Sequence, residues 1–387
     1  MRLAIAAAFL LLGLATASCS GSQIAPVACG QPGQWVAPAA GKAQPAELRA
    51  LLERMAQQQA VLLGETHDSA EDHRWQLHLL AQLHALQPRM AIGFEMFPRR
   101  VQPALDQWVA GGLSEAEFLQ RSEWDKVWGF DVRDYLPLFH YARMHRIPML
   151  ALNVERSLIE AIGKQGWEAV PLEQKEGVSK PAAPTADYRK SLRAIFEHHP
   201  AKNRSKGDDK QAFERFVESQ TTWDAAMAQV VAGHLQRHPD RLVVGIMGAG
   251  HVRYGDGVKH QLKELGIPRT GLLLTWPRGE DCAELGQGFA DGLFLVDPPK
   301  RNPPRLGVGT EVHEQGLRIT EVTPGSVAEA AGLQRGDVIV EVGGQPAKNI
   351  LTLRSVVQRQ PAGTWLPLKI KRADSELEVV ARFPLGS

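Results

Sequence analysis

The chain has 387 residues, with 44 Lys and Arg against 43 Asp and Glu and a formal net charge of +1. This length allows two or three domains of about 100 to 200 residues each. The balanced charge argues against a polybasic binder of nucleic acid or anionic membranes, so we expect no nucleic-acid partner. Apolar residues at 44% and charged residues at 22% exclude a disordered or a polytopic membrane chain, and three cysteines exclude a disulfide scaffold.

The N-terminus has the pattern of an export signal. Met1-Arg2 is a short positive region, and Leu3 to Ala15 is an apolar run shorter than the about 20 residues of a membrane span. Small residues then precede a cysteine in Thr16-Ala17-Ser18-Cys19, which resembles a bacterial lipoprotein signal. We expect a signal peptide over residues 1–18 and lipid on Cys19. The alternative is an ordinary signal peptide with an incidental cysteine.

Two further cysteines follow the predicted lipid anchor. Residues after Cys19 are small and polar, and we expect residues 19–44 to be a tether. If Cys19 carries lipid, Cys29 and Cys282 are left. They could pair in an oxidising periplasm, or their presence is a coincidence, because the sequence gives no distance between them.

Predicted helices and strands alternate from about Pro45 to Trp276. The first helix is indicated by apolar residues at i, i+3, i+4 and i+7, namely Leu48, Leu51, Leu52 and Met55. Ser114 and Glu117 have the spacing of a capping box and predict a later helix start. Buried strands are predicted over Ala60–Leu63, Met90–Glu95, Met149–Asn153, Leu242–Met247 and Leu272–Leu274. This alternation predicts an α/β fold, with a mostly parallel sheet covered by helices on both faces.

Two segments interrupt this pattern. Residues 173–210 are rich in Pro, Ala, Lys, Asp and His, which indicates a long excursion, either a passive loop or a flap. Residues 296–304 hold four prolines and predict a stiff linker. We therefore expect an α/β domain over residues 45–295 and a second, smaller domain over residues 305–387.

Polar residues stand at the ends of four predicted strands. Glu65 and His67 follow the first strand, Glu95 ends the second, Asn153 ends the third and His251 follows the fourth. In a parallel sheet these ends share the carboxyl edge, where open α/β sheets bind their ligands. Imidazole and carboxylate together suit a divalent first-row metal, and either Glu could act as a general base toward water.

The same short motif occurs twice. Gly-x-x-His stands at Gly64–His67 and at Gly248–His251, each time after an apolar strand, which favours one shared site. Taken singly, each residue could equally be a hydrogen-bonded loop histidine or a glutamate that caps a helix.

Five separated blocks resemble the ChaN family of haem-binding lipoproteins, which shares a superfamily with the Tiki metalloproteases and erythromycin esterases. The blocks are residues 61–73, 91–99, 134–159, 216–229 and 245–258. The resemblance implies a lipid-anchored protein of the periplasm or outer membrane that takes part in haem or iron uptake. It also implies paired haems, bound through tyrosinate between two subunits.

The resemblance also implies which residues and cofactors to expect. The Gly-x-x-His motifs carry over to His67 and His251, and the acid between them carries over to Glu95. In the Tiki branch such residues hold a divalent metal and hydrolyse peptides. We therefore expect b-type haem as the cofactor, with a divalent first-row metal ion as the alternative.

The chain has four tyrosines that could supply a phenolate, a hard anionic donor for Fe(III). Tyr135 and Tyr141 lie six residues apart, so a helix would turn them to different sides. Tyr254 follows His251 by three residues, and Tyr188 lies in the excursion. Tyr135, Tyr141 and Tyr254 are our candidate haem ligands, and each could equally be a half-buried side chain with a hydrogen-bonded hydroxyl.

The remaining aromatic residues and histidines are interpreted as follows. Trp124, Trp128 and Phe130 could form an apolar wall for a porphyrin or could belong to the core. The histidines of the helical stretches are interpreted as surface residues: His73, His78, His84, His140, His145, His234 and His238.

From Arg305 onward, short alternating strands and glycine turns predict a compact β-rich module. Pro324–Ala328, Ala331–Leu333 and Gly336–Ile339 resemble a PDZ domain of the bacterial HtrA type. Such domains bind an extended C-terminal peptide as an added strand. The resemblance implies that the loop Leu306, Gly307 and Val308 holds the peptide carboxylate, with a helix over residues 351–357 as the other wall. The alternative is a domain that packs on its own chain or mediates dimerisation.

These features together predict a lipoprotein of the cell envelope, placed at the outer membrane and facing the periplasm, with lipid as its only membrane attachment. It would bind haem in haem or iron uptake, form a homodimer around the haem, and dock a protein C-terminus in the PDZ groove. The alternative is a Tiki-type metal-dependent peptidase, with Glu65 and Glu95 as catalytic residues and His67 and His251 as metal ligands. A non-catalytic scaffold is the third interpretation.

Overall fold

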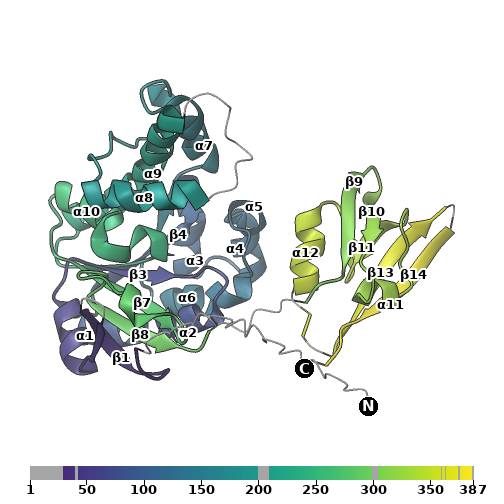
Figure 1. Cartoon of the computed structure of the whole chain (residues 1–387), viewed down its shortest axis with the longest axis horizontal. Helices are drawn as coiled ribbons and strands as arrows, with labels where there is room; N and C mark the ends of the chain where they lie inside the picture. The colour runs from purple at the N-terminus through teal and green to yellow at the C-terminus, as the bar shows by residue number, and fades with distance from the viewer. Residues whose placement is uncertain are drawn as a thin grey trace, which may run out of the picture.

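The computed structural model describes residues 29–39, 42–198, 209–298, 304–358, 360–361, 363–373 and 375–385. Their helices and strands form an N-terminal α/β body and a C-terminal β-rich body (Figure 1). The predicted signal peptide, Cys19 and most of the predicted linker lie outside the described residues. Within the described ranges, no helix has the length and hydropathy that crossing a bilayer requires.

The N-terminal body is built on an eight-stranded sheet in the order β2-β1-β8-β7-β3-β6-β4-β5. The strands from β8 to β5 run parallel, and β1 and β2 are added antiparallel beside β8. The strands are Trp35–Ala39 (β1), Lys42–Pro45 (β2), Ala60–Glu65 (β3), Met90–Pro98 (β4), Met149–Asn153 (β5), Leu242–Gly248 (β6), Thr270–Pro277 (β7) and Gly292–Val296 (β8). The predicted α/β class with a mostly parallel sheet is confirmed.

Helices cover both faces of this sheet (Figure 1). They are Leu48–Ala56 (α1), Ala70–Leu86 (α2), Gln102–Val109 (α3), Glu115–Arg121 (α4), Trp124–Val127 (α5), Val132–Met144 (α6), Arg156–Gln165 (α7), Ala186–His198 (α8), Asp209–Arg237 (α9) and Val258–Glu264 (α10). The predicted capping box is present at the start of α4, where the Ser114 and Glu117 side chains cap each other's backbone N–H.

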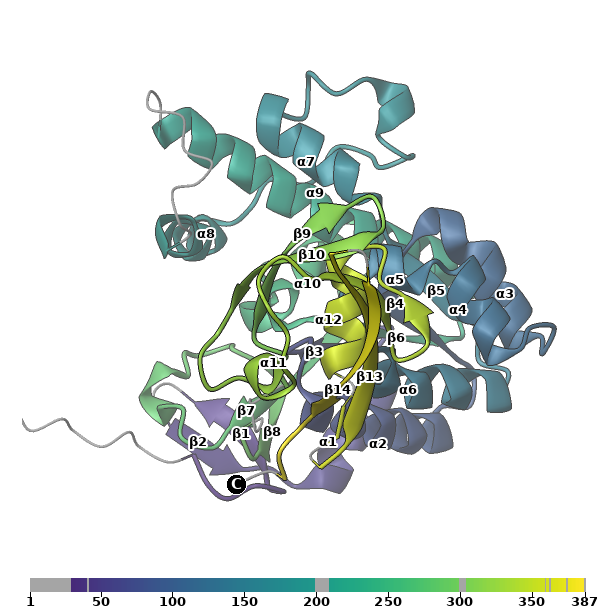
Figure 2. The ribbon, with the colours of Figure 1, turned by 90° about the vertical axis from the view of Figure 1, so that its right-hand side faces the viewer.

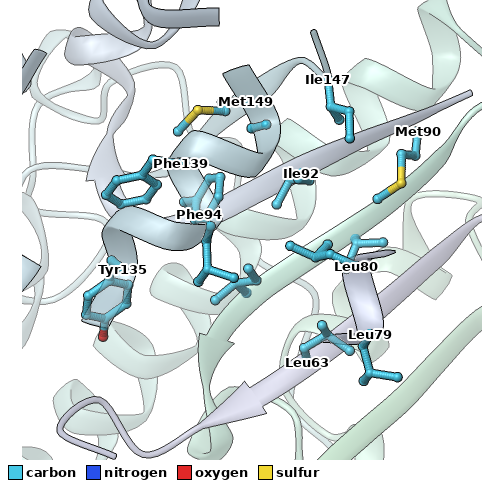
Figure 3. Close-up of a cluster of buried hydrophobic side chains, with 14 of the residues drawn as sticks. Leu63, Leu79, Leu80, Met90, Ile92, Phe94, Tyr135, Phe139, Ile147 and Met149 are labelled. Carbon is cyan, nitrogen blue, oxygen red and sulfur yellow. The ribbon is translucent and has the colours of Figure 1, made fainter. Parts of the chain in front are cut away.

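Alternate residues of the strands enter two different cores. In β3, Val61 and Leu63 face a core shared with α1, α2 and α6, part of which is drawn in Figure 3. Ala60 and Leu62 face the opposite core, which includes α9 and α10. Because both faces of the central strands are buried, their sequences are continuous apolar runs, which is why the sequence pattern predicts them.

Three strands lie outside the predicted set. β1 and β2 fall almost wholly within residues 19–44, which the sequence pattern assigns to a tether, and β8 immediately precedes the predicted linker. β2 is short, polar and largely exposed, so it carries no hydrophobic period. It is held by pairing with β1, which in turn pairs with β8.

A disulfide joins Cys29 and Cys282 across 253 positions of sequence, with their Cα atoms 5.1 Å apart. Cys29 lies before β1, and Cys282 begins the short helix η6 (Cys282–Glu284) after β7. The bond therefore attaches the first described residue to the segment after β7, which contacts the edge strand β2. Of the two alternatives that the sequence leaves open for these cysteines, the structure has the pair.

The excursion contains helix as well as loop. It includes most of the short helix η2 (Leu172–Gln174) and all of α8, and α9 begins at its end. The buried face of α8 carries Tyr188 and Leu192, which pack against Phe213 and Val217 of α9. Because only Tyr188 and Leu192 of α8 are buried, the helical period of apolar residues is weak. The Pro-rich composition of the surrounding segment therefore indicates a loop.

The C-terminal body is a small antiparallel sheet in the order β14-β13-β11-β10-β9, with β12 paired to β11 (Figure 2). Its strands are Val308–His313 (β9), Gly316–Val322 (β10), Val338–Val342 (β11), Gln345–Pro346 (β12), Trp365–Arg372 (β13) and Ser375–Arg382 (β14). Its helices are Val327–Ala330 (α11) and Ile350–Gln358 (α12). The strands and α12 enclose one apolar core of their own, so the β-rich second fold is confirmed.

Candidate functional site

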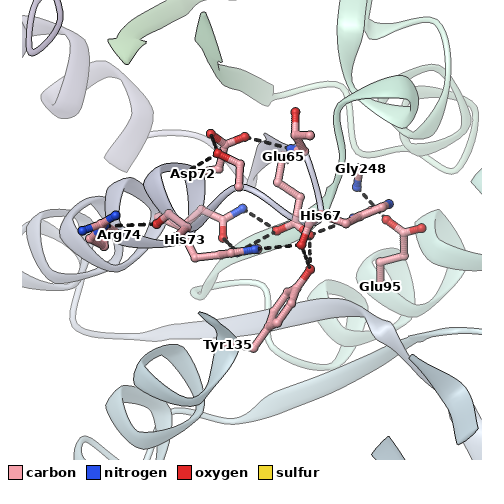
Figure 4. A network of polar contacts seen from close by, with 12 residues as sticks. Glu65, His67, Asp72, His73, Arg74, Glu95, Tyr135 and Gly248 are labelled. Carbon is pink, nitrogen blue, oxygen red and sulfur yellow. Dashed lines mark hydrogen bonds and ion pairs between the residues drawn. The ribbon is translucent and has the colours of Figure 1, made fainter. Parts of the chain in front are cut away.

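The sheet brings the predicted site residues to one edge. β6 lies between β3 and β4, and Glu65 at the end of β3 is in register with Gly248 at the end of β6. Glu95 lies near the end of β4 and is fully enclosed. His67 and His251 follow β3 and β6 at the same carboxyl edge, and Figure 4 shows His67 there beside Glu65 and Glu95.

Glu65 is the centre of the first half of the site. Its Oε1 lies 2.9 Å from Nδ1 of His67 and accepts the Tyr135 hydroxyl at 2.8 Å. Its Oε2 accepts from Nε2 of Gln76 at 2.8 Å and lies 3.5 Å from Nδ1 of His73. Four side chains therefore surround one buried carboxylate (Figure 4).

Glu95 and His251 form the second half. Glu95 Oε2 accepts the backbone N–H of Gly248 at 2.6 Å, and Oε1 lies 3.7 Å from Nε2 of His251. The other ring nitrogen of His251 lies 2.6 Å from Oδ1 of Asp224, whose Oδ2 accepts the Tyr188 hydroxyl at 2.6 Å. His251 is thus held between two buried carboxylates.

Gly248 allows the two halves to meet. A Cβ atom at this position would lie 2.9 Å from Cε1 of His67 and 3.6 Å from Oε2 of Glu95. The His67 ring therefore occupies the space over the glycine, which explains physically why the second Gly-x-x-His motif needs glycine there.

The charges of the site reinforce one another. Burial alone would raise the pKa of Glu65, but the His67 hydrogen bond and the charge of His73 outweigh it and hold that pKa below its usual value. Burial alone would lower the pKa of His67, and the carboxylates of Glu65 and Glu95 raise it above its usual value. For His251, the charges of Asp224 and Glu95 also outweigh burial and raise the pKa to about 9.

An aromatic wall stands beside His67. The His67 ring lies 4.8 Å from the Trp128 ring and 5.1 Å from the Phe130 ring, measured between centroids. Phe130 is 36% exposed, and the His67 side chain is 28% exposed. Trp124 is instead buried in the core, where its indole N–H donates to the carbonyl of Phe130. Two of the three predicted wall residues therefore lie beside the open side of His67.

The candidate tyrosines occupy different environments. Tyr135 is fully buried, and burial followed by the charge of Glu65 raises the pKa of its hydroxyl well above the usual value. The Tyr141 hydroxyl lies 3.1 Å from Nδ1 of His84. Tyr254 is 42% exposed, on the short helix η5 (Arg253–Gly255), with a positive φ of 60°. Tyr188 is buried against Asp224. Of these phenols, that of Tyr254 is the one most open to a ligand.

The donor set does not present a metal site. Among the described residues, no group of three or more His, Cys, Asp or Glu side chains is placed to hold a metal ion. In the pairs Glu65–His67 and Asp224–His251 the carboxylate oxygen lies against Nδ1 of the ring, so these two contacts do not involve Nε2 of either histidine. Asn153 also has a structural role, because its Nδ2 donates to the Glu95 carbonyl and its Oδ1 accepts from Val154 N.

Three participating residues were not singled out from the sequence as members of this site. His73, interpreted as a surface residue, is 2% exposed and, with Gln76 one turn later on α2, faces Glu65. Asp224 is fully buried on α9. The sequence does contain a signal for Asp224, because it is the one acid in the otherwise apolar stretch Trp223–Ala228. A carboxylate that such a stretch buries requires polar partners.

The predicted peptide-binding loop begins the C-terminal body. Leu306 is buried, and its carbonyl accepts from the N–H of Ala328 at 2.8 Å. Gly307 has a φ of 83°, and a Cβ there would collide with the Ser326 side chain. Val308 begins β9, the edge strand of its sheet, and the predicted other wall of the groove lies within α12.

Comparisons with known proteins cover both bodies. Residues 51–262, more than half of the chain, match the family described as haem-binding uptake, Tiki superfamily, ChaN. Residues 318–372 match the PDZ domain family. A solved structure of ChaN of Campylobacter jejuni, described as showing cofacial haem binding, is similar with a TM-score of 0.51 and 20% identity, over 67% of this chain and 96% of that chain. At this identity the likeness shows the fold.

Curated relatives match the C-terminal body. The putative serine protease HhoA of Synechocystis is 35% identical over 82 residues, which are 21% of this chain and 20% of the relative. The periplasmic serine endoprotease DegP of Salmonella typhimurium is 38% identical over 64 residues, which are 16% of this chain and 13% of the relative. The chain thus spans a fifth or less of the length of these relatives. It belongs to the ChaN family of haem-binding uptake proteins in the Tiki superfamily, and it carries a PDZ domain after the ChaN domain.

Proposed function

We propose that the chain binds b-type haem at the carboxyl edge of its α/β sheet and serves haem or iron uptake in the cell envelope. Membership of a haem-binding family is the observation that carries this proposal. The partly exposed aromatic wall of His67, Trp128 and Phe130 supports it, since flat aromatic surfaces and an imidazole suit a porphyrin. When bound, the haem would supply its iron as the cargo or the redox-active centre.

Among the candidate ligands we propose Tyr254. Tyr254 is 42% exposed, whereas Tyr135 is buried and donates its hydroxyl hydrogen to Glu65. A phenol whose pKa is raised by burial and a neighbouring carboxylate keeps its proton, and iron binds the deprotonated form. Tyr141, whose pKa is raised by burial, is the second choice.

The proposed homodimer and membrane attachment extend this function. ChaN of Campylobacter jejuni binds haem cofacially, which supports a paired arrangement around haem here. The Cys29–Cys282 disulfide suits an oxidising compartment such as the periplasm. We therefore propose an outer-membrane lipoprotein facing the periplasm, with lipid on Cys19.

For the C-terminal body we propose docking of a protein C-terminus. β9 is an edge strand, and its pairing within the described residues is with β10 alone. A free strand edge beside α12, preceded by the loop in which Gly307 has a positive φ, provides the elements that strand addition requires. Binding of fluorescent peptides with a free or an amidated C-terminus tests this: preference for the free carboxylate supports docking, and equal binding contradicts it.

A haemin titration of the full chain tests the proposed cofactor. We expect a Soret band that saturates as haemin is added, which gives the number of haems bound per chain. Sedimentation of the loaded protein tests whether the chains are paired. Absence of a shifted Soret band at micromolar protein would contradict haem binding. The Cys19→Ser variant should leave the Soret band unchanged and release the protein from the membrane fraction of its host.

A second candidate function is hydrolysis at the same edge. Two imidazole–carboxylate pairs, His67 with Glu65 and His251 with Asp224, favour it, since positioned imidazole and carboxylate groups serve in general acid–base catalysis. If this candidate holds, cleavage of a peptide library is lost in His67→Ala and His251→Ala. If cleavage is absent with and without added Zn²⁺, this candidate is excluded for peptides.

A further inference from the structure

A cavity separate from the carboxyl-edge site lies against the edge strand β5. Its volume is about 460 Å³, and its walls come from β5, α9 and the segment Arg99 to Asp106. The Gln102 side chain already satisfies the free backbone of β5, since its Nε2 donates to the Met149 carbonyl and its Oε1 accepts from Ala151 N. The cavity therefore does not need an added strand to complete its hydrogen bonds.

Positive charge dominates the polar part of this cavity. Arg99, Arg237 and Arg241 line it, with Asp106 as the one acidic residue among the lining residues. Arg99 donates to the backbone carbonyls of Glu176 and Ala226, and the carboxylate of Glu176, which does not line the cavity, also acts on its charge. The arrangement leaves a net positive lining that an anion would complement.

Two buried polar atoms in the lining have no partner among the described residues. They are Nε2 of His234 and Nε of Arg99. His234 is 5% exposed, and burial together with the charges of His238, Arg241 and Arg237 lowers its pKa to about 4. A neutral buried imidazole with an unpaired nitrogen is costly, and a ligand that hydrogen-bonds to it would remove that cost.

Gln102 and His238 also line the cavity, and the remaining lining is apolar. It comprises residues 148–151, which are Pro, Met, Leu and Ala, and Val230 of α9. A volume of this size falls in the range of small-molecule sites, which are mostly apolar with a few polar groups that fix orientation. An inorganic anion alone would leave the apolar part uncovered.

We infer that this cavity is a second ligand site, which binds an organic carboxylate with an apolar body. The carboxylate lies against Arg237 and Arg241, its charge complementing theirs, and the apolar body covers the β5 side. Since none of the residues that line it belongs to the carboxyl-edge site, the inference stands independently of haem binding.

Calorimetric titration of the full chain with octanoate tests the inference, with 1-octanol as the uncharged ligand of equal length and inorganic phosphate as the charge without an apolar body. We expect saturable octanoate binding that is stronger than binding of either control. Arg237→Gln and Arg241→Gln should each weaken octanoate binding about fivefold to tenfold. Arg54→Gln, an exposed arginine on α1, is the matched control and should leave it unchanged.

Three outcomes would overturn the inference: no octanoate binding, equal binding of octanoate and 1-octanol, or unchanged affinity in both cavity variants. The same variants should give the wild-type Soret band with haemin. A loss of octanoate binding with an intact Soret band therefore separates this site from the proposed haem site.

Discussion

Oδ1 of Asp224 lies 2.6 Å from Nδ1 of His251, where the Asp224 side chain is fully buried and the His251 side chain is 11% exposed. The second oxygen of Asp224 accepts the Tyr188 hydroxyl from the excursion helix α8. Helix α9 thus contributes the carboxylate of Asp224, which favours the protonated form of His251. Helix α8 contributes the Tyr188 hydroxyl, which donates to that carboxylate. Nε2 of His251 lies 3.7 Å from Glu95, so the charged imidazole lies between two carboxylates.

Replacing Asp224 tests that relationship. Asp224→Asn keeps the shape and removes the charge that raises the pKa of His251 to about 9. Since burial then opposes the imidazolium with less compensation, we expect this pKa to fall by one unit or more. Titration of the His251 ring signals by NMR measures it, with the exposed Asp240→Asn as the control. A pKa that stays near 9 in Asp224→Asn would show that Asp224 is not its cause.

The same pKa makes stability depend on pH. The ordinary value for an unfolded chain is about 6.5, and the folded value is about 9. The stabilisation from the charged His251 is therefore complete below pH 6.5 and is lost as the pH rises through 9. We expect the free energy of unfolding to fall by up to about 3 kcal/mol across this window. Urea denaturation measures it, and an equally steep fall in His251→Gln would refute the assignment.

Gly248 provides a steric test of the site. Gly248→Ala places a methyl group against the His67 ring and near Glu95, which should cost about 1 to 3 kcal/mol of stability. Gly250→Ala is the matched control, because nothing lies within 4 Å of a Cβ at that position. Denaturant unfolding of both variants measures the difference. Equal stabilities would mean that His67 does not occupy the space over Gly248.

The disulfide should contribute to the stability of the α/β body. It closes a loop of 253 positions, and removing such a constraint typically costs about 2 to 4 kcal/mol. Thermal unfolding with and without dithiothreitol measures this loss. The Cys29→Ser, Cys282→Ser double variant should be insensitive to the reductant. Unchanged stability on reduction of the wild-type protein would contradict a stabilising role.

The sequence predicts the centre of the α/β sheet well and its edge poorly. β3, β4, β5, β6 and β7 have both faces buried, so each is a continuous apolar run. β2 is the outermost strand, and its exposed Lys42 to Pro45 segment is set by pairing that the sequence does not display. The C-terminal body was predictable because its glycine turns and strand lengths are local features.

The candidate site shows the same division. Glu65, His67, Glu95 and His251 could be predicted because each is tied to the end of a strand, and topology brings these ends together. The partners of these residues come from helices, where the direction of a side chain depends on tertiary packing. His73 illustrates this. A histidine among the polar residues of a helix is interpreted from sequence as a surface residue, but in the structure His73 lies on the buried face of α2 and faces Glu65.

The most direct test of haem binding through Tyr254 is the absorption spectrum of the haemin-loaded full chain, compared between wild type, Tyr254→Phe and Tyr141→Phe. We expect tyrosinate-to-iron charge-transfer absorption in the wild type and in Tyr141→Phe, and its loss in Tyr254→Phe. Because both substitutions remove only a hydroxyl group, folding should be preserved in both. A Tyr254→Phe spectrum identical to that of the wild type, or a wild-type chain without a Soret band, would contradict this assignment.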